Sequence, residues 1–324
     1  MHRCSTLGAF AMCGLVAVGA ASCRGREDSA KRELERRGID LSRQAFLAAV
    51  RRDNREEVRL FIEAGITPAG ALLEAAKEGR CEALAGLLEG GLEVTGANGA
   101  EALLLAIGKS HRICAERLQA SGADFNGRNI YGETFLLRSA RRKSTRQLRK
   151  LLAHGADPSL ASWTGETPLM AAAGSGRKRS VVLLFAAGAD PEATDQDGWT
   201  ALLFAVRDGH RGSARRLLAA GADVNVVSEL GWTPLMWAAR EGRTALVADL
   251  VAAGAEIDLA TKAGRTALVQ AAAQGHAEVV QQLLEAGARP DLIVEGVDAR
   301  RWASTGGWPE IEDLLAQAAG SVRE

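Results

Sequence analysis

The chain has 324 residues and carries 40 Lys and Arg side chains against 40 Asp and Glu side chains. This formal net charge of zero argues against a nucleic-acid partner, because phosphate backbones attract proteins with an excess of basic residues. Aromatic residues make up only 4% of the chain, so the positions at which they occur are informative.

Residues 1–22 have the pattern of a signal peptide. Arg3 gives a positive start, and residues 7–21 form an uncharged run of small and apolar residues, too short to span a bilayer. The segment Ala20-Ala21-Ser22-Cys23 resembles the end of a bacterial lipoprotein signal, although Ala20 replaces the usual Leu. The resemblance implies an exported protein of the cell envelope, held at the membrane only through lipid on Cys23. Secretion without lipid and a cytosolic protein with an apolar start are the alternatives.

Residues 23–37 predict a linker followed by an N-terminal capping helix. The segment carries many charges of both signs, and residues 29–37 read as a polar helix that ends at Gly38. A polar helix is what the exposed end of a stack of helices requires.

A motif returns every 33 residues through the larger part of the chain. It reads Gly-x-Thr-x-Leu, and a second glycine follows it with the same period. The first glycine of the motif is Gly132, Gly165, Gly198, Gly231 or Gly264, and the second is Gly155, Gly188, Gly221, Gly254 or Gly287. A period of 33 residues with Thr-Pro-Leu at residues 167–169 and 233–235 resembles the ankyrin repeat.

The resemblance implies an all-α fold, an α-solenoid of about nine repeats that each combine a helix-turn-helix with a hairpin finger. Residues 38–293 would form the repeats, and residues 294–324 a degenerate C-terminal capping repeat and tail. The predicted helix N-caps are Thr167, Thr200, Thr233 and Thr266, and Pro168 and Pro234 suit the first helical position. Each repeat can bury its apolar face only against its neighbours.

The first two repeats, between Gly38 and Gly91, are shorter than the period. The missing residues are those of the finger, so we expect a stack of helices nearly without fingers there. The third repeat, at about 92–122, is nearly full length, and we expect Gly99 at its finger position.

Cys81 and Cys114 fall in the second helices of adjacent repeats. Export would permit a disulfide between them. Their offset of about two residues along the helices favours two free thiols, because a bridge requires close Cα atoms. The sequence leaves both states open.

No combination of residues predicts catalysis, a cofactor or a metal site. His111, His210 and His276 lie in the turn before the second helix, where the resemblance implies a hydrogen bond between repeats. The carboxylates at the starts of the fingers recur from repeat to repeat, as a catalytic pair would not. We therefore expect that the protein is not an enzyme. We also expect it to be a monomer.

The scarce tryptophans favour one binding surface. In the ankyrin family, partners contact the finger tips and the exposed inner side of the first helix. The residues at these positions are Trp163, Trp199 and Trp232 in the fingers, Arg138, Phe204 and Trp237 on the first helices, and Arg141, Arg142, Arg207 and Arg240 at the helix ends. Trp and Arg are enriched in binding hot spots. We expect Trp199 and Trp232 to be surrounded by solvent, whereas Phe204 and Trp237 have packing between repeats as an alternative.

A basic run without any acid occupies residues 134–156 and continues at residues 177–179. This run is either a solvated face or a basic ridge. Such a ridge would bind an acidic protein or an anionic surface of the envelope.

The function that the sequence favours is a non-catalytic protein–protein interaction module of the cell envelope. An inhibitor or immunity-type protein that blocks a toxin or an envelope enzyme is the alternative. An enzyme and a structural envelope protein held by charge are the competing classes.

Overall fold

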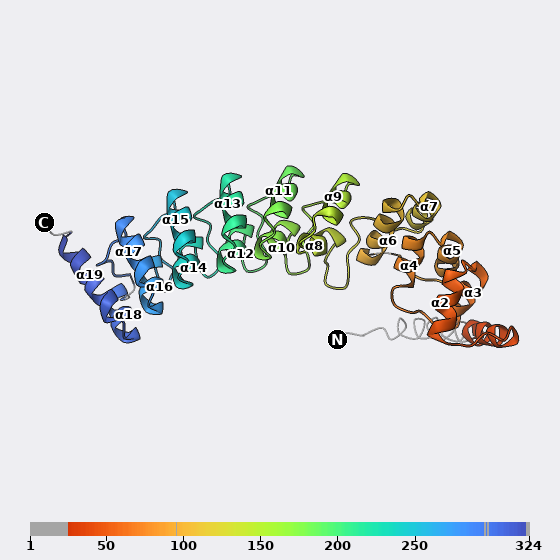
Figure 1. The fold of residues 1–324 in the computed structure, drawn as a ribbon. Helices are drawn as coiled ribbons and strands as arrows, with labels where there is room; N and C mark the ends of the chain where they lie inside the picture. The colour runs from red at the N-terminus through yellow and green to blue at the C-terminus, as the bar shows by residue number, and fades with distance from the viewer. Residues whose placement is uncertain (1–24, 95, 295, 297, 322–324) are drawn as a thin grey trace, which may run out of the picture. The chain divides into compact units, whose positions relative to one another are not determined.

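The computed structural model of the chain describes residues 25–94, 96–294, 296 and 298–321 (Figure 1). The predicted signal peptide at 1–22 and Cys23 lie outside the described residues. Within the described part, helices alternate with turns and no extended strand is present, which confirms the all-α prediction. The chain divides into two compact units, residues 1–129 and 130–324.

The first unit consists of short helices joined by short connections. A helix over 25–36 precedes α2 (Arg43–Arg51), α3 (Arg55–Glu63), α4 (Ala71–Glu78), α5 (Cys81–Glu89), α6 (Gly96–Gly108) and α7 (Arg112–Ala120). Their apolar faces meet in a core in which Leu34 of the first helix is fully buried. Phe46 and Phe61 pack edge to face with ring centroids 5.5 Å apart.

Two connections of the first unit are too short for a finger, and one expectation fails there. Residues 64–70 and 90–95 are the whole connections from α3 to α4 and from α5 to α6, which leaves no room for a hairpin. Gly99 does not lie in a finger, because α6 begins at Gly96 and includes it. A Cβ at Gly99 would overlap the carbonyl oxygen of Val94, so this glycine permits a close approach of the chain to the helix.

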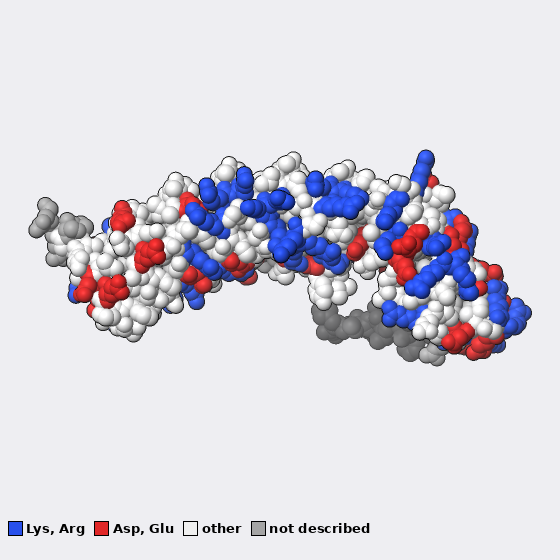
Figure 2. Space-filling model, viewed as in Figure 1, with Lys and Arg blue, Asp and Glu red and all other residues white. Residues whose placement is uncertain are grey.

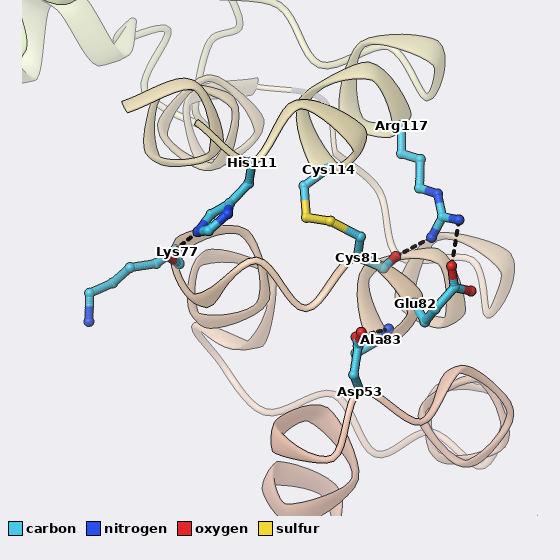
Figure 3. The surroundings of a disulfide bond; sticks show 8 residues. All are labelled: Asp53, Lys77, Cys81, Glu82, Ala83, His111, Cys114 and Arg117. Atoms are coloured by element: carbon cyan, nitrogen blue, oxygen red, sulfur yellow. Dashed lines mark hydrogen bonds and ion pairs between the residues drawn. A yellow bond between two sulfur atoms is a disulfide. The ribbon is translucent and has the colours of Figure 1, made fainter. Parts of the chain in front are cut away.

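Cys81 and Cys114 form a disulfide between α5 and α7 (Figure 3). Cys81 opens α5 and Cys114 is the third residue of α7, so the offset inferred from the sequence is real. Two residues correspond to only about 3 Å along a helix axis, and the two Cα atoms lie 4.9 Å apart. The expectation of free thiols is therefore wrong. Closing a loop with a sequence separation of 33 stabilises the fold by about 3–4 kcal/mol in the chain-entropy treatment.

The first turn of α5 is also held by side chains from both neighbouring helix pairs (Figure 3). Asp53 Oδ1 accepts a hydrogen bond from the backbone N–H of Ala83 at 2.7 Å, which satisfies one of the free donors at the helix start. Arg117 of α7 donates to the carbonyl of Cys81 and, at 2.7 Å, to Glu82. In the first unit, adjacent repeats are thus joined by side chains and a covalent bond.

The second unit repeats one helix pair and its finger. Its helices are α8 (Phe135–Ala140), α9 (Arg146–Ala153), α10 (Pro168–Gly174), α11 (Lys178–Ala186), α12 (Ala201–Arg207), α13 (Arg211–Ala219), α14 (Pro234–Arg240), α15 (Thr244–Ala252), α16 (Ala267–Gln274), α17 (Ala277–Glu285), α18 (Ala299–Gly306) and α19 (Pro309–Ser321). Within this unit the first helices from α8 to α16 form one row and the second helices from α9 to α17 form another (Figure 1). One position of the second helix is fully buried in five successive repeats, at Leu151, Leu184, Leu217, Leu250 and Leu283.

The helix starts in the second unit agree with the sequence prediction. Thr167, Thr233 and Thr266 are N-caps whose side chains accept a hydrogen bond from the third helical residue, and Pro168 and Pro234 stand at the first helical position. Thr200 is also an N-cap, but its buried hydroxyl makes no hydrogen bond with the described residues. This hydroxyl is therefore a local defect in an otherwise regular series.

In five repeats a side chain of the next repeat covers the glycine in the turn between the two helices, at Gly79, Gly176, Gly209, Gly242 and Gly275. Gly307, between α18 and α19, has no heavy atom within 4 Å. His276 Nε2 lies 2.9 Å from the carbonyl oxygen of Arg240, and its ring rests on Gly242, which has a φ of 63°. Trp308 takes the same place against Gly275 in the last pair. The histidine and glycine pairs are His111 with Gly79, His210 with Gly176 and His276 with Gly242. The hydrogen bond between repeats that the resemblance implies is present for His111 and His276, whereas His210, among the described residues, only packs against Gly176.

A pair of glycine substitutions tests this packing. Gly242 and Gly254 both have positive φ, at 63° and 89°, so alanine costs about 1–2 kcal/mol at either position. Only at Gly242 would the new Cβ meet another repeat, 2.7 Å from His276 Nδ1, whereas nothing lies within 4 Å at Gly254. We expect Gly242→Ala to lower the free energy of unfolding more than Gly254→Ala in chemical denaturation. Equal losses would show that the His276 ring moves away freely and contributes no packing.

Candidate functional site

The fingers of the second unit are bonded to one another through their backbones. Successive tips form a ladder in which each finger donates to the one before it. The bonds run from Trp163 N–H to Tyr131 O, from Gln196 N–H to Thr164 O and from Glu229 N–H to Asp197 O, each at 3.1 Å. The tips therefore have a defined order and little freedom to move independently.

A polar side chain closes each finger just before the first helix. Asp195 Oδ1 accepts the N–H of Trp199 at 2.8 Å, and the N–H of Asp195 donates to the Trp199 carbonyl at 3.1 Å. Ser228 makes the same two bonds with Trp232, at 3.3 and 3.0 Å. These bonds hold both tryptophans at the base of their fingers, beside the helix, and not at the tips.

Four aromatic rings and two guanidinium groups form one continuous group, here called the aromatic–arginine cluster. Its members are Trp199, Phe204, Arg207, Trp232, Trp237 and Arg240. The Trp199 ring lies 5.3 Å from both Phe204 and Trp237, and Trp237 lies 4.6 Å from Trp232. The structure thus brings together rings from two fingers and from α12 and α14, as their common position in the repeat predicts.

The two arginines of the aromatic–arginine cluster lie over the rings. The Arg207 guanidinium is 4.9 Å from the Trp199 centroid, and the Arg240 guanidinium is 5.4 Å from that of Trp232. At such distances the ring quadrupoles attract the cation. Arg207 also donates to Asp208 at 2.7 Å, and this hydrogen bond raises the pKa of Arg207 above its ordinary value. The arginine side chains remain 38% and 41% exposed, so the cluster presents positive charge to solvent.

The expectation that Trp199 and Trp232 are surrounded by solvent is wrong, because Trp199 is half-buried and only 9% of Trp232 is exposed. The place of Trp232 at the finger base puts it against Trp237 and beneath Arg240. Trp199, Phe204 and Trp237 are half-buried. The Trp237 Nε1–H is buried and has no acceptor among the described residues, a cost in stability of about 1–3 kcal/mol. The aromatic–arginine cluster therefore packs the repeats together and also reaches the surface.

Several apolar side chains of the second unit's fingers are exposed, and Ile130 has the largest exposed fraction, 84%. Tyr131, Trp163 and Leu230 are 66%, 60% and 77% exposed, and we call them the finger-tip row. Tyr131 and Leu230 each precede the finger glycine, and the Trp163 ring lies against Gly132. Sequence reasoning identified Trp163 but missed Tyr131 and Leu230. Their shared position before the glycine was the available signal.

The arginines expected at the start of the second unit have different surroundings. Arg141 donates to Glu133 at 2.6 Å and to Glu166 at 2.5 Å, which ties two repeats together. Burial alone would lower the pKa of Arg141, but its hydrogen bonds and attraction to these two carboxylates outweigh burial and raise it. Arg138 is half-buried, and Arg142 is exposed. Arg141 thus joins two repeats through its ion pairs. Its charge is neutralised by Glu133 and Glu166, so it does not contribute to the predicted basic ridge.

No group of three or more His, Cys, Asp and Glu side chains in the described part of the chain is placed to hold a metal ion. None of the helices over residues 25–94, 96–294 and 298–321 is long and apolar enough to cross a membrane.

The difference in burial between the two finger-base tryptophans makes a testable prediction. Trp232→Ala removes a buried ring and should lower the free energy of unfolding by about 3–5 kcal/mol. Trp199→Ala should lower it less, because the Trp199 ring is half-exposed. Thermal and urea denaturation of the two variants measure the difference, with Leu217→Ala as a reference for a fully buried side chain. A Trp232 variant as stable as the wild type would contradict its burial.

The family comparison agrees with this architecture. A family model described as ankyrin repeats (3 copies) matches residues 140–228 and 212–294, which lie in the second unit. No curated protein gives a significant match to the chain. Residues 140–294 are therefore ankyrin repeats, and the chain has the all-α fold of an ankyrin-repeat solenoid.

Proposed function

We propose that the protein is a non-catalytic interaction module that binds a protein partner through its finger-tip row and the adjoining aromatic–arginine cluster. Ankyrin repeats generally mediate protein–protein interactions. The observation that carries the proposal is the exposure of Tyr131 and Trp163 on adjacent fingers, at 66% and 60%. Large aromatic side chains in solvent contribute little to folding, and contiguous exposed apolar groups mark interaction sites.

The geometry of the fingers favours tight binding. Burying apolar surface contributes about 25 cal/mol for each Å² removed from water. Because the backbone ladder already orders the tips, a partner loses little of this energy to ordering loops. The stacked arginines Arg207 and Arg240 are likewise held in place before a partner arrives.

The binding proposal predicts a large loss of affinity with a small loss of stability. Tyr131→Ala and Trp163→Ala should each weaken binding by about 2 kcal/mol, or roughly 30-fold in Kd. Their free energy of unfolding should fall much less than that of Trp232→Ala, because both side chains are mainly exposed. Partners captured by the wild-type chain identify the ligand, and isothermal titration with the purified partner then measures the affinity of each variant.

Ile113→Ala is the matched control for this experiment. Ile113 is 59% exposed and lies on α7 of the first unit, so it belongs to neither the finger-tip row nor the aromatic–arginine cluster. Its variant should bind the partner as the wild type does. Tip variants that bind normally, together with an Ile113 variant that does not, would overturn the proposed surface.

We also propose that the protein is exported and anchored in the cell envelope through lipid on Cys23. The pattern of residues 1–23 motivates this proposal. The disulfide between Cys81 and Cys114 supports export, because such bonds persist in oxidising compartments and are rare in the cytosol.

Metabolic labelling with palmitate tests the anchor. The wild-type protein should incorporate the label, and Cys23→Ala should abolish it. In the same preparation, peptides that contain Cys81 and Cys114 should be linked until a reductant is added, as read by mass spectrometry. A label that persists in the Cys23 variant contradicts the anchor, and two free thiols in the isolated protein contradict export.

A further inference from the structure

Three successive second helices carry only positive charges. The basic residues are Arg146, Arg149 and Lys150 on α9, Lys178 and Arg179 on α11, and Arg211, Arg215 and Arg216 on α13. None of these helices contains Asp or Glu, although the chain as a whole is balanced in charge. Figure 2 shows Lys and Arg gathered over α9, α11 and α13. Charge is therefore segregated onto this part of the second-helix row.

Most of these cations have no carboxylate partner. Arg211, at the edge of the row, pairs with Asp249 of α15 at 2.5 Å, and this hydrogen bond lowers the pKa of Asp249. Six other exposed cations form no side-chain hydrogen bond or ion pair with the described residues. One is Arg146, and the five that line the groove described next are Arg149, Lys178, Arg179, Arg215 and Arg216. Like charges that face solvent without partners repel one another, so folding alone gives no reason for this arrangement.

Five of the unpaired cations line a groove that runs over the helices. One part has a volume of about 460 Å³ and is lined by Thr145, Arg149, Lys178, Arg179, Val182, Leu183 and Arg216. A second part of about 370 Å³ is lined by Lys178, Gly212, Arg215, Arg216 and Ala219. The two parts share Lys178 and Arg216, and we call them together the basic groove. Val182 is 45% exposed, which gives the groove an apolar patch among its charges.

We infer that the basic groove binds an acidic segment of a partner protein, in which carboxylates flank an apolar side chain. Arginine guanidinium groups pair with carboxylates through two parallel hydrogen bonds, and four of the five unpaired cations of the groove are arginines. The apolar side chain of the segment contacts Val182. The match of charge to an acidic ligand is the argument for this occupant, since no anion of the chain itself occupies the groove among the described residues.

The shape and lining of the groove favour a polypeptide over other anionic ligands. No aromatic side chain lines it, so it lacks the stacking platform on which proteins hold single-stranded nucleic acid. A peptide can place acidic side chains within a few residues of an apolar one, which matches the cations around Val182 in the groove.

The basic groove is independent of the surface proposed above for partner binding. It lies on second helices and shares no residue with the finger-tip row or the aromatic–arginine cluster. One partner can therefore contact both surfaces, or two segments can bind at the same time. The two proposals can also fail separately, because different variants disrupt them.

Fluorescence anisotropy with a labelled peptide tests the inference. The probe is a short peptide of glutamates around a central leucine, titrated with the full chain at low and at physiological salt. We expect binding that weakens as salt rises, and a loss of about tenfold or more in affinity for Lys178→Glu/Arg216→Glu. Val182→Asp should weaken binding as well, because it places a carboxylate in the apolar patch.

The matched control is Lys262→Glu/Arg300→Glu, which changes the net charge of the chain equally at two exposed cations outside the groove. It should keep the wild-type affinity within about twofold. Tyr131→Ala/Trp163→Ala should also keep it, which separates this test from that of the finger-tip row. Unfolding midpoints of all variants check that they fold, and Arg179→Ala/Arg215→Ala provides a second, milder groove variant.

Three results would overturn the inference. Equal losses in the groove variant and the control variant would show that only net charge matters. Unchanged affinity in both groove variants would place the peptide elsewhere. Tighter binding of phosphatidylglycerol vesicles or single-stranded DNA than of the peptide, lost in the groove variant, would assign the groove to a phosphate ligand.

Discussion

The burial of each apolar helix face against the neighbouring repeat is the constraint on which this structure depends. The same leucine position is fully buried in five successive second helices, from Leu151 to Leu283. No helix pair can satisfy this need alone, so stability is built from contacts between neighbours. Side chains that point away from these contacts carry no such demand, and they make up the basic groove. The aromatic–arginine cluster does both, since it packs adjacent repeats and also reaches the surface.

The two units join their repeats in different ways. In the second unit, fingers bond to fingers through their backbones, and side chains of the next repeat cover Gly176, Gly209, Gly242 and Gly275 in the inter-helix turns. In the first unit, the connections over 64–70 and 90–95 are too short for fingers. There the disulfide of Cys81 with Cys114 and the contacts of Asp53 and Arg117 link adjacent pairs. In the first unit, a disulfide and side-chain hydrogen bonds thus connect adjacent repeats in place of the backbone hydrogen bonds between fingers.

The proposed binding surfaces of the second unit differ in chemistry because they lie on different rows. The fingers and first helices present aromatic rings with stacked guanidinium groups, so their contacts gain from apolar burial. The second helices α9, α11 and α13 present unpaired cations around a small apolar patch, so their contacts gain from charge pairing and depend on salt. Arg141 belongs to neither, since its ion pairs to Glu133 and Glu166 hold the repeats together.

The sequence by itself determined what each residue does within its own repeat. The period, the threonine caps, the prolines at helix starts and the turn glycines are local requirements of backbone geometry, and the structure confirms them. The tertiary structure decided what depends on a neighbour. Trp232 is covered by Trp237 and Arg240, Gly99 lies in a helix that passes close to Val94, and Cys81 meets Cys114 across two helices. The basic groove also appears only when α9, α11 and α13 lie side by side. A repeat pattern assigns each residue a position in its unit, but the distance and offset between adjacent units arise only from their packing.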